Sequence, residues 1–375
     1  MTKSIGIASI VVFLTALVRS LVGAIDDLPK PVAPAKEVGV PFDRYQVKDE
    51  LSRDVTYYLS TPPKESAGKP LPLVLWVQGS GCDSLFSKTP DGRVGGGLQN
   101  LVLKESKGRC RVMAVEKPGV KFCDSPARHG TCDDCSEEFK NEYAADRWAV
   151  ALEASLRDVI KRPDIDRGRV LAAGHSEGAS MVAKIAADVP EVTHVACLSG
   201  AGSTQLFDMA QIARRGLSGG GPRGGPNAEQ SGPDGSMIGS EDAETREARV
   251  EDVYHQAAEI AADPDSVTKT AWGHTFKRWS SFFRLSPVAE LKKSRARIYL
   301  AYGTADQSVP VESNDLARAE LFAAGRDVTC ERIVGVDHGY QKPGEQGYAG
   351  MNAIIGRVVE WFLAEAVRGA AEAAK

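Results

Sequence analysis

The chain has 375 residues, of which 42% are hydrophobic and 26% charged, and its formal net charge is -4. This composition is ordinary for a globular protein with a well-filled core, and the length permits one large α/β domain or two small ones. The slight negative charge, without a basic stripe interleaved with aromatic residues, argues against nucleic acid or another polyanion as a partner.

The N-terminus has the pattern of a secretory signal peptide. Lys3 precedes an apolar run over residues 5–18, and the small-residue exit Val22-Gly23-Ala24 follows. We expect residues 1–24 to be a signal peptide, which predicts a periplasmic or secreted protein with no stable membrane insertion after cleavage. The alternative is an uncleaved N-terminal membrane anchor, because this apolar stretch is nearly long enough to span a bilayer. The proline-rich residues 25–41 are expected to form a linker.

Strand-like and helix-like segments alternate over residues 42–375, which predicts a single α/β domain with a mainly parallel sheet. The expected strands, in chain order, are 44–47, 55–60, 72–78, 111–116, 170–173, 193–198, 297–302 and 328–334, with the first two antiparallel. The expected helices are 143–160, 178–187, 311–324 and 351–370. The strand at 72–78 is apolar throughout, as is typical of a strand buried on both faces.

Residues from about 203 to 291 break this rhythm and are expected to form an insertion into the domain. Within it, residues 216–244 are dominated by Gly, Pro, Ser and acidic residues, which predicts a flexible loop. Trp272, Trp279 and Phe282 follow and are candidates to line a substrate pocket for an apolar or aromatic group. The alternative interpretation is that these rings simply pack the insertion onto the core.

Seven cysteines are present: Cys82, Cys110, Cys123, Cys132, Cys135, Cys197 and Cys330. In an exported protein, cysteines that pair form disulfides more often than metal sites. Cys132 and Cys135 form a C-x-x-C in a polar loop, where we favour a disulfide-stapled loop over redox chemistry or a zinc site. The connectivity stays open, and the buried Cys197 is the best candidate for a free thiol. We expect no metal and no cofactor.

The strongest chemical motif is the G-x-S-x-G at residues 174–178, directly after an expected strand and directly before an expected helix. A sharp strand-to-helix turn forces Ser176 into strained dihedral angles and exposes its hydroxyl, while the glycines leave room for neighbouring backbone. Residues 216–220 match the same pattern but follow no strand, so we interpret Ser218 as a chance match. Ser176 is therefore the candidate nucleophile.

A nucleophilic serine needs a base and a group that orients the base. Functional residues of doubly wound sheets lie beyond the carboxyl ends of the strands. Asp306 follows the strand at 297–302 and His338 follows the strand at 328–334, in the chain order Ser, Asp, His. The alternatives are that Asp306 only caps a turn, or that Asp208 supplies the acid.

The oxyanion hole requires two backbone N–H donors. We expect one from Glu177, directly after the nucleophile, and the other from the loop after the strand at 72–78. Ser80 is the first choice in that loop and Gly79 the second.

The phrases GHSEG, AYGTADQSVP and VGVDHGY resemble the α/β-hydrolase superfamily, and most closely its dienelactone-hydrolase and prolyl-oligopeptidase-like branches. The resemblance implies a mainly parallel eight-stranded sheet with helices on both faces and an insertion, often a lid, after the sixth strand. The loop QGSG departs from the HGGG of many lipases and esterases.

These residues predict hydrolysis of a carboxylic ester through an acyl-enzyme on Ser176, with a small-molecule ester as substrate. The alternative is a serine peptidase or aminoacyl hydrolase of prolyl-oligopeptidase type acting on a short peptide. A minor alternative is a non-catalytic binding protein on the same fold.

Overall fold

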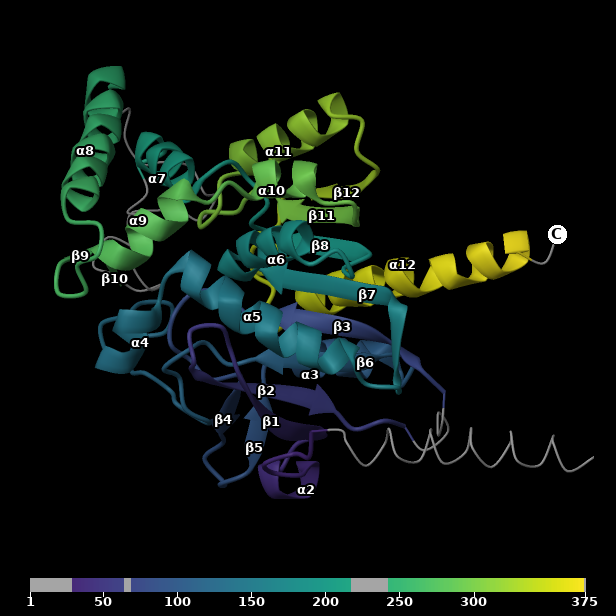
Figure 1. Cartoon of the computed structure of the whole chain (residues 1–375). Coiled ribbons are helices and arrows are strands. Elements are labelled where there is room, and N and C mark those ends of the chain that lie inside the picture. Colours follow the sequence, from purple (N-terminus) through teal and green to yellow (C-terminus); the bar gives the residue numbers. More distant parts are fainter. Residues whose placement is uncertain (1–28, 64–68, 217–241, 374–375) are drawn as a thin grey trace, which may run out of the picture.

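The central element of the computed structural model is an eight-stranded sheet with the strand order β1-β2-β6-β3-β7-β8-β11-β12 (Figure 1). The structure describes residues 29–63, 69–216 and 242–373, with side chains up to residue 364. The strands are β1 (Phe42–Lys48), β2 (Asp54–Ser60), β3 (Leu71–Val77), β6 (Arg111–Val115), β7 (Ile165–His175), β8 (His194–Leu198), β11 (Arg297–Gly303) and β12 (Val328–Ile333). β2 pairs antiparallel with β1 and β6, and all other neighbours in the sheet are parallel. The predicted mainly parallel eight-stranded sheet is confirmed.

Helices cover both faces of this sheet. One face packs against α5 (Ala145–Ile160), α6 (Glu177–Asp188), α10 (Pro287–Lys293) and α11 (Val311–Ala323). The other packs against α3 (Leu98–Ser106) and α12 (Ala349–Ala373). In α5, Trp148, Leu152 and Leu156 recur at helical spacing and are all buried, which is why this segment folds as a helix on the sheet.

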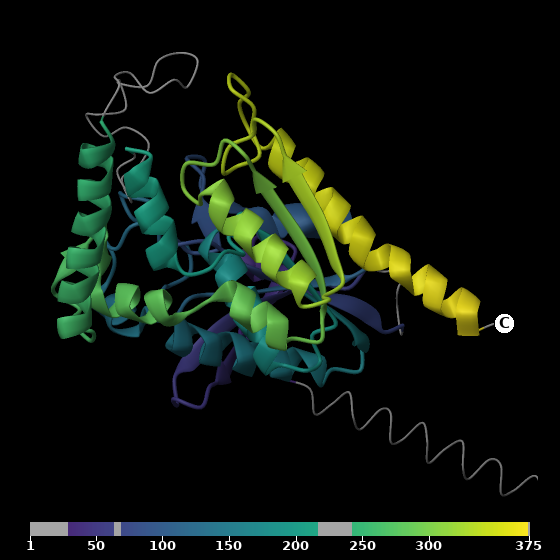
Figure 2. The same ribbon diagram turned by 90° about the horizontal axis from the view of Figure 1, so that it is seen from above.

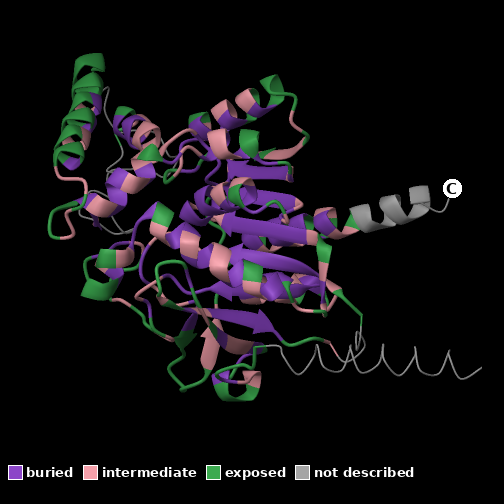
Figure 3. Ribbon diagram, viewed as in Figure 1, coloured by how far each residue is buried: buried purple, intermediate pink, exposed green. Residues whose placement is uncertain are grey.

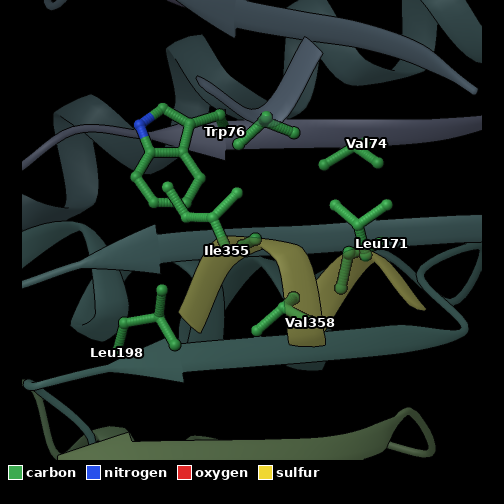
Figure 4. A pocket seen from close by; sticks show the side chains of 9 residues that line it. Val74, Trp76, Leu171, Leu198, Ile355 and Val358 are labelled. Carbon is green, nitrogen blue, oxygen red and sulfur yellow. The ribbon is translucent and has the colours of Figure 1, made fainter. Parts of the chain in front are cut away.

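The interface between α12 and the sheet is closely packed. A small void of about 10 Å³ lies between Ile355 and Val358 of α12 and residues of the sheet such as Val74 and Leu171 (Figure 4). This volume is barely enough for one water molecule, and the surrounding side chains are apolar. The void is therefore a packing defect of the core with no room for a substrate.

The segment before β1 corrects one expectation. Residues 29–41, which we expected to belong to a linker, pack onto the domain. Ala33 forms a bridge to Arg44, α2 (Ala35–Val38) follows, and Val38 is only 3% exposed. The apolar side chains of Ala33, Val38 and Val40 complete the second core cluster, so burial holds this segment in place.

Besides α3 and β6, three short elements lie between β3 and α5. β4 (Phe86–Lys88) and β5 (Val94–Gly96) form a hairpin, and α4 (Glu137–Glu142) precedes α5. Ser136 caps α4 by accepting a hydrogen bond from the Phe139 N–H. These elements connect the candidate oxyanion loop to the rest of the domain.

The insertion lies between β8, the sixth strand of the sheet in chain order, and β11 (Figures 1 and 2). It contains α7 (Gln205–Arg214), α8 (Ala243–Ala262), β9 (Thr270–Ala271), β10 (His274–Thr275) and α9 (Phe276–Arg284). α7, α8 and α9 share a small apolar cluster of their own. The outer side of α8 is exposed (Figure 3).

Several sequence expectations fall outside the described residues. These are the signal peptide at 1–24, most of the loop expected at 216–244, and Ser218. Within the described ranges, none of the helices combines the length and the apolar character needed to cross a membrane.

Candidate active site

The turn from β7 into α6 places Ser176 at the carboxyl edge of the sheet. Ser176 has φ 58° and ψ -128°, a strained conformation for a residue with a side chain. A Cβ on Gly174 would lie 2.4 Å from the Gly178 carbonyl oxygen, and one on Gly178 would lie 2.2 Å from the Val77 carbonyl oxygen. Both glycines of the motif are thus required by the close approach of neighbouring backbone, as the sequence argument expected.

Asp306 and His338 meet beside this turn. Nδ1 of His338 lies 2.8 Å from Oδ2 of Asp306. The other oxygen, Oδ1, accepts hydrogen bonds from the N–H groups of Ser308 at 2.8 Å and Val309 at 2.9 Å. Asp306 is 1% exposed, so these bonds fix its carboxylate in place. Asp306 therefore caps the turn after β11 and also orients the imidazole.

Two other acids lie near this site: Asp208, the alternative from the sequence, and Asp337, the chain neighbour of His338. Oδ1 of Asp337 accepts hydrogen bonds from the N–H groups of Gly339 and Gln341 within its own loop. Asp208 lies on α7, where burial, together with the charge of Asp306, raises the pKa of its carboxyl to about 7. The structure joins Asp306, and not these two acids, to the histidine.

His175 links the nucleophile turn to the His338 loop. Its Nε2 lies 2.8 Å from the carbonyl oxygen of His338, and the two rings lie 4.6 Å apart. Because a carbonyl oxygen only accepts, Nε2 of His175 carries the proton. Burial lowers the pKa of His175 to about 3, so the ring is neutral. In the described part of the chain no hydrogen bond joins Ser176 Oγ to His338 directly, and the two loops are linked through His175, whose ring also lies 6.2 Å from that of Tyr340.

The candidate oxyanion loop follows β3 and lies beside Ser176. A Cβ on Gly79 would lie 3.3 Å from Cβ and 3.7 Å from Oγ of Ser176. Lys117, just after β6, donates from Nζ to the carbonyl oxygens of Gly79 at 2.5 Å and Gly81 at 2.6 Å. Lys117 thus holds the backbone on both sides of Ser80, at a point where Gly79 lies close to Ser176.

A disulfide anchors the far end of the same loop. Cys82 pairs with Cys135 across 53 residues of sequence. Cys135 therefore does not pair with Cys132, its neighbour in the C-x-x-C, and Cys132 is a buried free thiol. The expected staple exists, but it joins the oxyanion loop to the loop before α4. Cys197 is free and buried, as its apolar sequence context indicated.

A buried ion pair lies next to Ser176. The carboxylate of Glu177 pairs with the guanidinium of Arg278 from α9 and accepts a hydrogen bond from the Tyr143 hydroxyl. The side chains of Glu177 and Arg278 are 2% and 3% exposed. The guanidinium lies 4.0 Å from the centre of the Trp279 ring and 4.5 Å from that of Phe282. The insertion is thus fastened to the residue next to Ser176.

The three aromatic residues proposed for a substrate pocket lie in packed surroundings. Trp279 is 5% exposed and its indole N–H donates to the carbonyl of Ala271, while Phe282 is 1% exposed and belongs to the main core. Trp272 is half-buried and packs edge-on against Trp279. These contacts favour the alternative interpretation, in which the rings pack the insertion onto the core.

A surface hollow of about 320 Å³ lies beside the disulfide. Its lining includes Cys82 and Cys135 together with Val120, Asp124 and Asp134. Neither in this hollow nor at any other place in the described ranges are three or more His, Cys, Asp or Glu side chains arranged to hold a metal ion.

Comparison with known proteins identifies the fold family. The model of the alpha/beta hydrolase family matches residues 74–346, well over half of the chain. The chain belongs to the alpha/beta hydrolase family. The match includes the nucleophile turn, Asp306 and His338, and it confirms the resemblance seen in the sequence.

Individual relatives of this alpha/beta hydrolase are distant. A curated protein, the probable chloroplastic glutamyl endopeptidase of Arabidopsis thaliana, is 24% identical over 173 residues, which cover 45% of this chain and 17% of that protein. Among solved structures, an acylaminoacyl peptidase in complex with Z-Gly-Gly-Phe-chloromethyl ketone has a TM-score of 0.54 at 14% identity, over 86% of this chain and 41% of the other. The acylaminoacyl peptidase of Pyrococcus horikoshii has a TM-score of 0.53 at 15% identity, with the same coverage. The chain thus spans less than half the length of these relatives.

Sequence reasoning missed four residues of this site: Lys117, Tyr143, His175 and Arg278. Lys117 had a detectable signal, because it lies two residues past the carboxyl end of β6, at the functional edge of a parallel sheet. Tyr143 and Arg278 had none, since they reach Glu177 from positions 34 and 101 residues away in the chain.

Proposed function

We propose that this alpha/beta hydrolase is a serine hydrolase that cleaves acyl substrates through a covalent intermediate on Ser176. The observation that carries the proposal is the His338 Nδ1–Asp306 Oδ2 hydrogen bond beside a strained serine, in a loop that His175 ties to the nucleophile turn. Asp306 keeps the proton of the neutral imidazole on Nδ1, which leaves Nε2 of His338 as the base.

In the proposed reaction, Nε2 of His338 takes the proton of the Ser176 hydroxyl as Oγ attacks the substrate carbonyl. The resulting oxyanion accepts hydrogen bonds from the backbone N–H groups of Glu177 and Ser80. The imidazolium then donates its proton to the leaving group. Water releases the acyl group by the same steps in reverse, which restores the free serine.

For the substrate we propose a carboxylic ester, which needs no special provision for a poor leaving group. A peptide or aminoacyl amide is the second candidate. The similarity to peptidases favours it: a probable glutamyl endopeptidase by sequence and acylaminoacyl peptidases by fold. Both reactions use the same three side chains, and the surfaces around them decide between the two.

The test is turnover of a chain-length series of p-nitrophenyl esters beside a set of aminoacyl p-nitroanilides, by wild-type protein and Ser176→Ala. We expect ester turnover by the wild type and a loss of roughly 10³-fold or more in kcat in the variant, because a triad acts as a unit. Ser218→Ala, in the second G-x-S-x-G, is the matched control and should keep full activity. A fluorophosphonate should label the wild type but not Ser176→Ala.

Anilide turnover without ester preference would assign the chain to the peptidases. Folded wild-type protein that neither turns over substrate nor reacts with the fluorophosphonate would overturn the proposal in favour of a binding protein. Full activity in Ser176→Ala would reject the nucleophile itself.

A further inference from the structure

Lys117 is a charged side chain in the interior that the proposed chemistry does not use. It is 1% exposed, and its Nζ lies 4.8 Å from the centre of the Trp148 ring and 5.4 Å from that of Tyr143. Its two hydrogen-bond acceptors are the carbonyl oxygens of Gly79 and Gly81, on either side of Ser80. A buried ammonium is costly, so its partners call for an explanation.

Peptide geometry connects Lys117 to the oxyanion hole. In a planar trans peptide the C=O of one residue and the N–H of the next point in opposite directions. No cis peptide occurs in the described chain. Since the Gly79 carbonyl points at Lys117, the Ser80 N–H of the same peptide unit points away from it. Gly79 itself is in contact with Ser176.

The loop has a second fixed point at the next residue. The Gly81 N–H donates to the Tyr143 hydroxyl at 3.3 Å, and that hydroxyl donates to the Glu177 carboxylate. Tyr143 therefore bridges the two segments that carry the proposed oxyanion donors, Ser80 and Glu177.

We propose that Lys117, with Tyr143, is a positioning residue of the oxyanion hole: it holds the two carbonyls that flank Ser80 and so aims the Ser80 N–H at the substrate oxyanion. This inference rests on the proposed function. It adds a part of the machinery that lies outside the triad, on the segment after β6 and at the end of α4.

The charges around Lys117 suit this role. Glu177, Asp83, Glu116 and Arg278 face it, and burial lowers its pKa to about 8, so the ammonium remains charged at neutral pH. The acidic neighbours offset the charges of the buried ammonium and of Arg278, so the effect of Lys117 on the loop comes from the two hydrogen bonds that it donates to the carbonyl oxygens of Gly79 and Gly81.

The test compares Lys117→Met, which keeps the length of the side chain but removes its charge and its donors, with Lys121→Met in the same loop. Lys121 is exposed and serves as the matched control. On the best ester substrate we expect Lys117→Met to lower kcat by about 10- to 100-fold with little change in KM, because losing an oxyanion donor outright costs about 10²–10³ in kcat. Lys121→Met should match the wild type.

A trifluoromethyl ketone analogue of that substrate gives a second readout, because its serine adduct places an oxyanion in the hole. Its inhibition constant should rise in Lys117→Met by about the same factor as kcat/KM falls. The inference would be overturned if KM and the inhibition constant of the analogue rose by the same factor, or if kcat did not change. A general packing defect would not weaken the analogue selectively.

If Lys117→Met does not fold, Tyr143→Phe takes its place, since it removes only the hydroxyl that accepts from Gly81 and donates to Glu177. A selective loss of kcat and of analogue affinity is expected there too, and its absence would reject the inference. Failure of the proposed function is distinguishable, since the wild type would then show neither turnover nor fluorophosphonate labelling.

Discussion

Asp306 is buried and Asp208 is half-buried, and the two acids lie near the same site in different surroundings. Asp306 has two N–H donors and His338 around its carboxylate. Oδ1 of Asp208 is buried without a hydrogen-bond partner, and its pKa is raised to about 7 by burial and by the charge of Asp306. The first environment stabilises a charge, whereas the second favours the protonated acid.

This contrast predicts a pH-dependent gain from Asp208→Asn. The folded-state pKa of Asp208 lies above its unfolded value, so its contribution to stability is complete at acid pH and is lost as the pH rises through about 7. The neutral asparagine escapes this loss. The variant should therefore match the wild type near pH 4 and exceed it at pH 8, by at most about 4 kcal/mol in unfolding free energy.

Urea denaturation of both proteins from pH 4 to pH 8.5 measures this difference. Because Asp208 does not contact His338, turnover by Asp208→Asn should equal that of the wild type. A gain that is independent of pH, or one that grows toward acid pH, would contradict the assignment of a raised pKa.

At the scale of elements, α9 is fixed to the nucleophile turn. Arg278 reaches Glu177 at the start of α6, and Phe282 enters the core beneath α5. Insertions at this position often act as lids, but this helix is fastened by a buried charge pair. The sequence pattern of α9 is a row of aromatic residues at helical spacing. That pattern did not indicate that Arg278 pairs with Glu177.

We predict that Arg278→Ala lowers the unfolding free energy by about 3–5 kcal/mol, because it leaves the Glu177 carboxylate buried without its cation. Arg284→Ala, at the exposed end of the same helix, is the control and should change stability by less than about 0.5 kcal/mol. Urea denaturation compares the two. The double change Arg278→Met/Glu177→Gln should recover part of the loss, and no recovery would show that the side chains act through packing alone.

At the scale of the whole molecule, the disulfide between Cys82 and Cys135 closes a loop that includes β6 and the Lys117 segment. For a loop of 53 residues, chain-entropy arguments give a stabilisation of about 4 kcal/mol. Such a bond persists in oxidising compartments and is lost in reducing ones.

Replacing both cysteines by serine should therefore lower the unfolding free energy by about 3–4 kcal/mol and also lower kcat, since Cys82 lies two residues from Ser80. Cys123→Ser, which alters a free thiol, is the control. Thermal denaturation and ester turnover, with and without reductant, separate the two effects. Insensitivity of both to reductant would show that the bond neither stabilises the fold nor supports the loop.

Most of the sheet was predictable because its inner strands, such as β3 and β8, are short apolar runs with clear ends. The expected strand at 328–334 is β12 (Val328–Ile333), whereas β7 begins at Ile165 and not at 170, because polar residues such as Asp166 and Arg167 hide its first half. The turn around Ser176 was predictable from local sterics. Contacts between distant segments, such as Lys117 with Gly79 and Cys82 with Cys135, have no local pattern and needed the folded chain.

The backbone of Ser176 has a consequence for protein engineering. Its dihedral angles cost of order 1–3 kcal/mol for a residue with a side chain, and glycine would adopt them freely. A mutational search that selects only for heat resistance will therefore favour glycine at position 176 and discard the nucleophile. Thermostable variants of this chain should be selected on turnover and stability together, because at this one residue the two requirements oppose each other.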